Sequence, residues 1–489
     1  MKKLTAIVCV IAAMITIFIP AKGESTAMNE SKYGLHVEED GTVTLEGEPF
    51  YGFGVNYFGA FARYVESPGQ STKEFTDGLA GLASYNIPFI RIPLCSYYPS
   101  YYELYDSDPE KVFSYLKLVL DECEKNNIGV IGSLMWWDAV IAAHLGAKRS
   151  DMGVIGSKVL EYAKKYTRDV VSRFADHPAI WGWEIGNEYN LDADLCDPEL
   201  KMFLWPDGIS GMPLDGVNGY DYLTSDELVV FYKEIAGVIR EYDTYRLITT
   251  GNGEMRPSAY AMRRASRGKN KDHVWTVQWN ANTRKQFEEM NEFYTPDPID
   301  TLCFHLQNGS YDGSNKYVMS FSLFGKTIDN EEYFRAYYET AKKLGKACFF
   351  GEFGDMLDME TAPDVIEKFR EVTDAISGSG IQIAALWQFQ DYTDAGVAGE
   401  KLAVLSELNL KLKADGKQKT ASAWQTESVP ETTTEPDTTT VTESVTNMLD
   451  GDGYTAEKKY GALPYIAAAA AVLIAAAVIV IIVKKKRKK

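Results

Sequence analysis

The feature that most constrains the fold is a regular alternation of short β-rich runs with longer amphipathic segments of helical period. The β-rich runs are Tyr51 to Tyr57, Phe89 to Leu94, Gly129 to Met135, Ile180 to Ile185, Leu247 to Thr250, Thr301 to Phe304, Ala347 to Gly351 and Ile383 to Trp387. The segments after them are Lys73 to Tyr85, Pro109 to Lys125, Ser157 to Phe174, Ser225 to Tyr242, Asn282 to Tyr294, Asn330 to Leu344, Ala362 to Ser377 and Leu402 to Lys413. Eight strands, each followed by a helix, favour a closed parallel (β/α)8 barrel of the TIM type, with long strand-to-helix loops, over an open doubly wound sheet.

The two ends of the chain predict export and membrane attachment. Residues 1–23 contain two lysines near the start, Lys2 and Lys3, followed by an apolar run, which is the pattern of a secretory signal peptide. Near the other end, Leu463 to Val483 is apolar, uncharged and long enough to span a bilayer. Residues 484–489 are all basic, which predicts a cytoplasmic tail and an extracellular remainder. The protein is therefore expected to be anchored in the cell membrane by one C-terminal helix.

Between the ends, the composition predicts one folded domain and a linker. Residues 32–425 form the body, which is the size of a single barrel with long loops. Residues 426–460 are rich in Thr, Glu and Pro and poor in large apolar residues, so we expect an extended, disordered stalk. Within the stalk, the Asp-Gly-Asp-Gly run at 450–453 lacks most calcium-loop ligands, so a polar turn is the favoured interpretation.

Charge and cysteine usage exclude several function classes. The formal net charge is −19, which argues against nucleic acid as a partner. The chain has six cysteines, and their spacing matches neither a zinc site nor a disulfide scaffold, so buried free thiols are expected after Cys9 leaves with the signal peptide. No predicted strand leads into a glycine-rich phosphate loop. We therefore expect no metal and no organic cofactor.

The run IWGWEIGNEYN, residues 180–190, places two glutamates in a buried strand and just after it. Strand alternation sends Glu184 into the barrel, one layer below the mouth, where burial requires it to be hydrogen-bonded or protonated. The same alternation turns Trp181 and Trp183 outwards against the helices, as core residues. Glu188 lies two pleats further along, at the open end. It is the better candidate for an acid.

Other polar and aromatic residues follow the predicted strands, at the end of a barrel where active sites are built. They are Asn56, Arg91, Trp136, Trp137, Asp138, Asn187, Asn252, Glu254, His305, Gln307, Glu352, Trp387, Gln388 and Gln390. Two carboxyl groups on roughly opposite strands, surrounded by amides and aromatic faces, suit the cleavage of a glycosidic bond. Of the amides, Asn56 and Gln307 are expected to contact the substrate. One carboxyl group protonates the leaving oxygen while the other attacks the anomeric carbon.

These residues resemble glycoside hydrolases of clan A, most closely family 5, which includes cellulases and mannanases. The motifs that carry the resemblance are GFGVNYF, RIPL, WEIGNE, FHLQ, FFGEFGD and ALWQF. The resemblance implies that Glu188 is the acid/base and Glu352 the nucleophile. It further implies that Asn187 binds the 2-hydroxyl of the sugar and that Arg91 supports the nucleophile. His305 and Trp387 would line the cleavage subsite.

The chain departs from the family pattern at two places. The family commonly has His-x-Tyr after strand six, whereas this chain has Gln307 at the tyrosine position; either Gln307 or Tyr311 can supply the donor. A histidine common after strand three is replaced by Trp136 and Trp137. One of these two tryptophans is expected to pack and the other to face a sugar, with Trp136 favoured as the ligand contact.

Several other candidates have structural interpretations of comparable weight. Asn252 and Glu254 are as consistent with loop structure as with binding, and Asp138 and Asp355 are expected to cap loops. Trp279 lies in an insertion that is a candidate cleft wall. Three long insertions, Cys196 to Thr224, Asn252 to Asn280 and Gln307 to Asp329, fall on the strand-to-helix side and are expected to shape the cleft.

The sequence thus predicts a retaining β-glycosidase that acts on β-linked poly- or oligosaccharide, of the β-mannan or β-glucan type, at the cell surface. We expect Arg91 to lower the pKa of Glu352, and the nearby negative charge to keep Glu188 protonated near neutral pH. A barrel that binds glycans at the cell surface without hydrolysing them is the alternative. The intact pair of glutamates argues against it, and the glutamine at position 307 favours it.

Overall fold

The structure is a computed structural model that describes residues 33–66, 72–95, 98–194, 223–267, 281–306, 321–324, 326–354, 364–390 and 396–421. The predicted signal peptide, stalk, membrane helix and basic tail all lie outside these ranges. Within these ranges, no helix is both long enough and apolar enough to cross a membrane.

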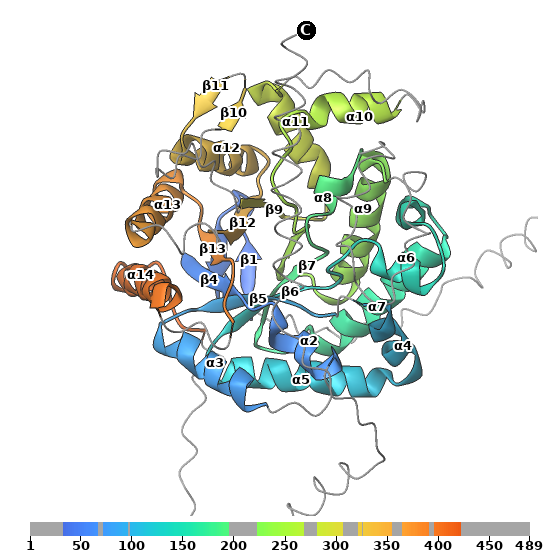
Figure 1. The fold of residues 1–489 in the computed structure, drawn as a ribbon, viewed down its shortest axis with the longest axis horizontal. Coiled ribbons are helices and arrows are strands. Elements are labelled where there is room, and N and C mark those ends of the chain that lie inside the picture. Colours follow the sequence, from blue (N-terminus) through green and yellow to red (C-terminus); the bar gives the residue numbers. More distant parts are fainter. Residues whose placement is uncertain are drawn as a thin grey trace, which may run out of the picture. The chain divides into compact units, whose positions relative to one another are not determined.

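Eight parallel strands close into a barrel, as the sequence predicted (Figure 1). In chain order they are β4 (Gly52–Asn56), β5 (Phe89–Pro93), β6 (Gly129–Ser133), β7 (Ile180–Glu184), β8 (Leu247–Thr249), β9 (Thr301–Leu306), β12 (Ala347–Phe353) and β13 (Ile383–Leu386). The strands pair in sequence order, and β13 pairs with β4 to complete the closure. All eight predicted strands are therefore confirmed. The carboxyl ends of parallel strands meet at one end of the barrel, which is the barrel mouth.

Helices surround the barrel on its outside (Figure 1). The helices that alternate with the strands are α3 (Lys73–Ser84), α5 (Pro109–Lys125), α7 (Lys158–Phe174), α9 (Ser225–Tyr242), α11 (Arg284–Tyr294), α12 (Asn330–Lys343), α13 (Val365–Ser379) and α14 (Gly396–Ala414). Helix α9 begins with a capping box: the Thr224 side chain accepts from the backbone N–H of Glu227, and the Glu227 carboxylate accepts from the backbone N–H of Thr224.

Shorter elements occupy the strand-to-helix loops, and the sequence did not predict them. They are α2 (Gly59–Glu66), α4 (Pro99–Ser107), α6 (Val140–His144), the 3₁₀ helix η1 (Arg149–Gly153), α8 (Tyr189–Asp192), α10 (Ala259–Arg267) and the hairpin of β10 (Phe321–Leu323) and β11 (Lys326–Ile328). Their periodic runs are short, so sequence pattern alone gave no basis for them.

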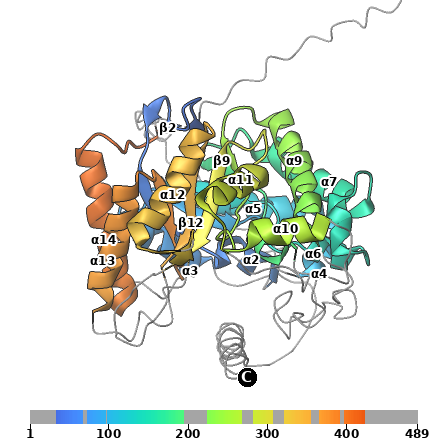
Figure 2. The ribbon, with the colours of Figure 1, turned by 90° about the horizontal axis from the view of Figure 1, so that it is seen from above.

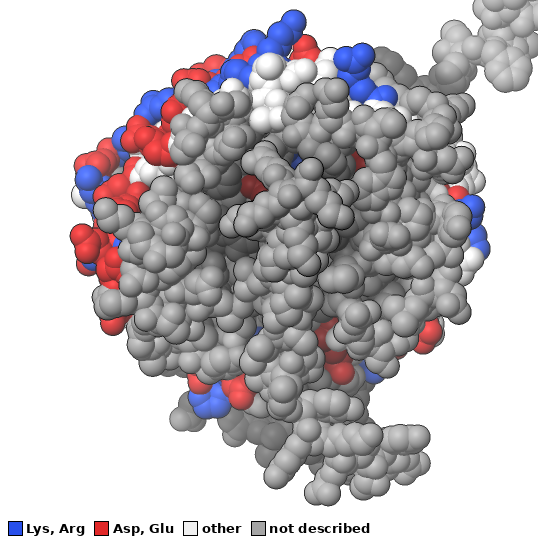
Figure 3. All heavy atoms as spheres, turned by 45° about the horizontal axis from the view of Figure 1, so that its top comes forward, with Lys and Arg blue, Asp and Glu red and all other residues white. Residues whose placement is uncertain are grey.

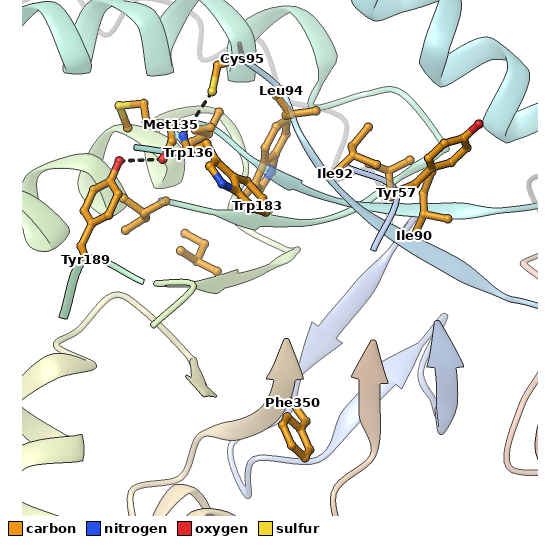
Figure 4. Close-up of a cluster of buried hydrophobic side chains, with 14 of the residues drawn as sticks. Tyr57, Ile90, Ile92, Leu94, Cys95, Met135, Trp136, Trp183, Tyr189 and Phe350 are labelled. Carbon is orange, nitrogen blue, oxygen red and sulfur yellow. Dashed lines mark hydrogen bonds between the residues drawn. The ribbon is translucent and has the colours of Figure 1, made fainter. Parts of the chain in front are cut away.

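Alternation along each strand divides the buried side chains into two sets. On β5, Ile90 and Ile92 point outwards and pack against the helices, whereas Phe89 and Arg91 point into the barrel. The outer set is the larger; part of it is drawn in Figure 4, where Ile90, Ile92 and Trp183 belong to it. The alternation thus places apolar residues under the helices while leaving the interior free for a polar layer near the mouth.

A small antiparallel sheet closes the end of the barrel opposite the mouth. It consists of β1 (Leu35–Val37), β2 (Val43–Leu45) and β3 (Glu48–Pro49), and the sequence did not predict it. Figure 2 shows β2 at the end away from α2 and α4, which follow strands at the mouth. The buried face of this sheet, together with Phe50, packs on inward-facing residues such as Phe89 and Phe349. We refer to this apolar half of the interior as the barrel floor.

Trp181 differs from the prediction. Both tryptophans of β7 are buried core residues, as expected, and Trp183 points outwards, where its Nε1 donates to Asp243 at 2.8 Å. Trp181 instead belongs to the barrel floor and makes an edge contact with Phe50, at 5.4 Å between ring centroids. The reason is a β-bulge: Val130 pairs with Ile180 but Ile131 pairs with Gly182, so Trp181 leaves the alternation.

The described cysteines are free and buried, as predicted: Cys95, Cys123, Cys303 and Cys348. Cys196 lies outside the described residues. Among the described surface residues visible in Figure 3, acidic and basic side chains are interspersed along the edge of the molecule, as expected for a solvated exterior.

Candidate active site

Arg91 lies at the centre of the site. Its side chain is 0% exposed inside the barrel and engages two carboxylates. Its Nε and Nη2 donate to the two oxygens of Glu184 at 2.8 and 2.7 Å, and its Nη1 donates to Glu352 Oε1 at 2.6 Å. The bidentate pair fixes the plane of the guanidinium group, so its remaining N–H groups point in defined directions. Glu184 is therefore hydrogen-bonded inside the barrel, as predicted.

Glu352 faces the interior because β12 contains a β-bulge. Phe350 pairs with Phe304, but Glu352 pairs with His305, so Gly351 is an extra residue relative to β9. Without that extra residue, strict alternation would turn Glu352 outwards with Phe350. Burial raises the pKa of Glu352, and His305 and Arg91 oppose the shift. The net direction is opposite to our expectation, because burial outweighs the ion pair.

Glu188 lies at the mouth, where 30% of its side chain is exposed. It precedes α8 and has a left-handed backbone, with φ 58° and ψ 21°, which is uncommon for a residue other than glycine. Burial of its carboxyl group raises its pKa to about 7, and Arg91 opposes the shift. Glu188 therefore holds a proton near neutral pH, as predicted, but the cause is burial and not the charge of Glu352.

His305 connects the two candidate carboxyl groups. Its Nδ1 lies 3.1 Å from Glu188 Oε1 and 3.6 Å from Glu352 Oε1. Burial lowers the pKa of its imidazole to about 4, so the ring is neutral at neutral pH. The oxygen of each glutamate and the histidine nitrogen all lie within 4.8 Å of one another. The structure thus brings together three residues that are far apart in the sequence.

Two asparagines flank Arg91. Asn187 Oδ1 accepts from Arg91 Nη2 at 2.8 Å, which leaves its Nδ2 group to donate elsewhere. Asn56 Oδ1 accepts from Arg91 Nη1 at 2.8 Å, and its Nδ2 donates to the Gly351 carbonyl at 2.9 Å. Asn56 is buried with both ends engaged. This arrangement differs from our prediction of a substrate contact and makes Asn56 a support for the β12 bulge.

The aromatic residues at the mouth form a cluster over Arg91. The Trp136 ring lies 4.7 Å from the guanidinium carbon of Arg91 and stacks on Trp387 at 6.3 Å, and the ring of Phe58 meets both edge-on. Trp136 is only 2% exposed, whereas Trp387, Phe58 and Trp137 are partly exposed. Contrary to the expected assignment, Trp136 is therefore the packed member of its pair.

Contacts from neighbouring elements fix the backbone that carries Trp136 (Figure 4). The Trp136 N–H donates to Cys95 Sγ at 3.2 Å, and the hydroxyl of Tyr189 donates to the Met135 carbonyl at 2.6 Å. These contacts hold the end of β6 against β5 and α8. They position the indole above Arg91.

Glu254 adds a third carboxyl group to the mouth. Burial raises its pKa to about 7, and the charge of Glu188 adds to the shift. Asn190 holds this loop, since its side chain accepts from Gly253 N at 2.8 Å and donates to the Glu254 carbonyl at 3.1 Å.

Asn252 accepts from the Tyr232 hydroxyl at 2.5 Å, which favours the structural interpretation of Asn252. Asp138 pairs with the buried Arg149 at 3.0 Å, also a structural contact.

Among the described residues, three groups have the donor types of a cation site: Glu188 with His305 and Glu352, Glu184 with Cys303 and His305, and Asp121 with Glu124 and His177. The first two surround Arg91, whose fixed positive charge opposes a second cation. In the third, His177 Nδ1 accepts from the Ala179 N–H at 3.2 Å, so its Nε2 carries the hydrogen and faces Asp121 as a donor.

Four residues singled out from the sequence lie outside the described residues: Gln307, Tyr311, Asp355 and Trp279. Two of the predicted insertions, Cys196 to Thr224 and Gln307 to Asp329, also fall mainly there, whereas Asn252 to Asn280 is described as far as residue 267 and contains α10. The choice between Gln307 and Tyr311 as the donor in place of the family tyrosine therefore stays a prediction.

The fold is a (β/α)8 barrel whose mouth holds one glutamate after the fourth barrel strand, Glu188, and one on the seventh, Glu352. A model described as Cellulase (glycosyl hydrolase family 5) matches residues 44–392, most of the chain. The protein belongs to glycosyl hydrolase family 5. A search of curated proteins found no match.

Solved structures share the fold at low sequence identity. An endo-1,4-beta-mannanase from Rhizomucor miehei has a TM-score of 0.52 at 14% identity, covering 77% of this chain and 99% of that one. A family 5 mannosidase from the same organism has a TM-score of 0.51 at 13% identity, covering 79% and 99%. A mutant of that mannosidase, in complex with mannosyl-fructose, has a TM-score of 0.52 at 14% identity, covering 80% and 100%. These likenesses establish the fold of the barrel.

Proposed function

We propose that the protein is a retaining glycosidase that hydrolyses O-glycosidic bonds in β-linked polysaccharide or oligosaccharide. The observation that carries this proposal is the short separation of Glu188 and Glu352, with one oxygen of each within 4.8 Å. Retaining enzymes hold their two carboxyl groups about 5–5.5 Å apart, whereas inverting enzymes leave about 6.5–9.5 Å for a water molecule. The geometry of this pair fits the shorter class.

In the first step, Glu352 attacks the anomeric carbon while Glu188 gives its proton to the leaving oxygen. The C–O bond to the leaving group breaks as the bond to the Glu352 carboxylate forms. The hydrogen bond from Arg91 at 2.6 Å favours the carboxylate form of Glu352 and fixes its orientation. A Glu188 carboxyl with a pKa of about 7 remains protonated enough to serve as the acid at neutral pH.

In the second step, water attacks the same carbon and Glu352 leaves. Glu188, now a carboxylate, takes a proton from the water and returns to its starting state. Neutral His305 contacts Glu188 without adding a charge between the two carboxyl groups. Because Asn187 Oδ1 is held by Arg91, its Nδ2 is directed to donate to the sugar 2-hydroxyl.

For the substrate, we propose a glycan of the β-mannan or β-glucan type. The partly exposed Trp387 and Phe58 supply aromatic surface of the kind that packs on sugar rings. The similar structures are described as a mannanase and a mannosidase, which makes β-mannan the first substrate to test.

For the location, we propose that a signal peptide exports the chain and that residues 463–483 anchor it, with the catalytic domain outside the cell. The support is the sequence pattern at the two ends. Protease treatment of intact cells should remove the barrel domain, and truncation before residue 463 should release the protein into the medium. Protection of the barrel in intact cells would contradict this location.

A mechanism-based trap tests the catalytic assignment. The protein is incubated with 2-deoxy-2-fluoro β-mannosides and β-glucosides that carry a good leaving group, and its peptides are then mapped by mass spectrometry. We expect the label on Glu352. Label on another residue would refute the nucleophile assignment.

Product analysis tests both retention and the alternative function. Proton NMR of the first product formed from β-mannan or β-glucan should show the β-anomer, and an α-anomer would overturn retention. Wild-type protein that binds these glycans but hydrolyses none of them would instead support the glycan-binding alternative.

A further inference from the structure

We infer that Gly351 is a positioning residue of the active site, because its missing side chain permits both the bulge that turns Glu352 inwards and the close approach of the His305 ring to β12. This inference rests on the proposed function. It concerns a residue that bears no reactive group.

The bulge is present relative to both neighbours of β12. On the β9 side, the pairing passes from Phe350–Phe304 to Glu352–His305. On the β13 side, it passes from Phe350–Ala384 to Phe353–Leu386, again with one extra residue on β12. Phe350 and Phe353 then both point outwards, where Phe350 stacks on Phe304 at 4.2 Å and Phe353 on Phe369 at 6.0 Å. Because Phe350 and Phe353 pack outside the barrel, the side chain of Glu352 between them is held towards the barrel interior.

Space, and not an unusual backbone angle, makes glycine necessary at position 351. The backbone of Gly351 does not have a positive φ. A Cβ there would lie 2.5 Å from His305 Nε2, 2.8 Å from His305 Cδ2 and 2.9 Å from Cys303 Sγ. All three distances are shorter than van der Waals contact. Because Glu188 holds the other ring nitrogen at 3.1 Å, a displaced ring would lose its place between the carboxyl groups.

The backbone of the bulge is tied to the same network. The Gly351 carbonyl accepts from Asn56 Nδ2, and Asn56 Oδ1 accepts from Arg91, the residue that also holds Glu352. A side chain at position 351 would therefore disturb His305 directly and Glu352 through its own backbone. The expected consequence is a loss in turnover with little change in substrate binding.

The test compares three glycine-to-alanine variants of the full-length chain. In Gly351→Ala, kcat should fall about 10²-fold with KM little changed, the cost of a misplacement of about 1 Å. Gly132→Ala introduces a Cβ equally close to a neighbour, 2.5 Å from Leu94 Cδ1, but away from the carboxyl groups. Gly237→Ala introduces a Cβ into open space on α9. Both controls should keep kcat within about threefold of wild type.

Introducing Gly351→Ala into a His305→Ala protein distinguishes a positioning role of Gly351 from general misfolding. The His305→Ala variant removes the ring that makes the two shortest contacts with the new Cβ and leaves the Cys303 Sγ contact at 2.9 Å, so adding Gly351→Ala to it should give a folded protein and cost at most about threefold more in kcat. Equal losses from Gly351→Ala in both backgrounds would overturn the inference, as would a kcat of Gly351→Ala within about threefold of wild type.

The imidazole ¹⁵N signals supply a readout that needs no turnover. The chain has five histidines, and the His305→Ala variant identifies the signal of His305. This signal should shift in Gly351→Ala and stay in place in Gly237→Ala. An unmoved His305 signal would overturn the inference. Wild-type protein that hydrolyses no glycan would overturn only the proposed function, since the NMR result still decides the role of Gly351.

Discussion

The barrel interior has two halves that differ in what organises them. At the mouth, a buried arginine holds two glutamates and two asparagines within hydrogen-bond distance. At the barrel floor, inward-facing phenylalanines and Trp181 pack against the N-terminal sheet. Both halves come from the same inward positions of the same strands. The comparison shows that strand alternation, together with the bulges at Trp181 and Gly351, selects which residues are enclosed, whereas their chemistry decides whether the enclosed layer reacts or only stabilises.

The largest expected effect is at the mouth. Glu352→Ala should lower kcat/KM by roughly 10⁴-fold or more, since it removes the group proposed to bond to the sugar. Oligosaccharide binding, measured by calorimetry, should persist. If this variant keeps more than about a hundredth of wild-type activity, with contaminating enzyme excluded, the assignment of Glu352 as nucleophile is contradicted.

The matched change at the barrel floor is Phe349→Ala. Phe349 is fully buried and meets Phe89 edge-on at 6.4 Å between centroids. We expect the free energy of unfolding to fall by about 3–5 kcal/mol, from lost burial and the cavity left behind. Below the unfolding transition, kcat should remain near the wild-type value. Denaturant unfolding and steady-state kinetics check the two parts, and a comparable fall in kcat would show that the two halves are coupled.

Glu184→Gln probes the lower edge of the polar half. It breaks the buried pair with Arg91, which should lower the free energy of unfolding by about 3 kcal/mol. Arg91 would then interact with one carboxylate instead of two, so the pKa of Glu352 should fall. The acid limb of the kcat/KM profile should move to lower pH as a result. An acid limb that stays in place would show that Glu184 has no electrostatic influence on Glu352.

The smallest expected effect is the pH dependence of the wild type. Burial sets the pKa of Glu188 at about 7, and the reaction needs its protonated form, so kcat/KM should fall about tenfold per pH unit above that value. On the acid side, kcat/KM should fall as the buried Glu352 becomes protonated, at a pH above the ordinary range of a glutamate. Glu188→Gln should abolish the basic limb. A basic limb that survives in this variant would assign it to another group, such as Glu254, whose pKa is also about 7.

The sequence alone predicted the barrel, its eight strands, the inward position of Glu184, the burial of Trp183 and the family. These follow from local signals, namely period, strand alternation and motifs, which do not depend on which strands become neighbours. The assignments of Glu188 and Glu352 also came from the sequence and remain predictions, although the structure places the two within reach of one another.

Tertiary structure decided the features that depend on the register between neighbouring strands. The bulges at Trp181 and Gly351 break the alternation, and although each strand contains a glycine, a glycine alone does not fix the register with the neighbouring strands. They send Trp181 to the barrel floor and turn Glu352 inwards. The burial of Trp136 and the engagement of Asn56 likewise depend on contacts with Arg91 from another strand. Local pattern fixes which residues can face inwards, but only the closed barrel determines which of them meet, because those contacts join residues far apart in the chain.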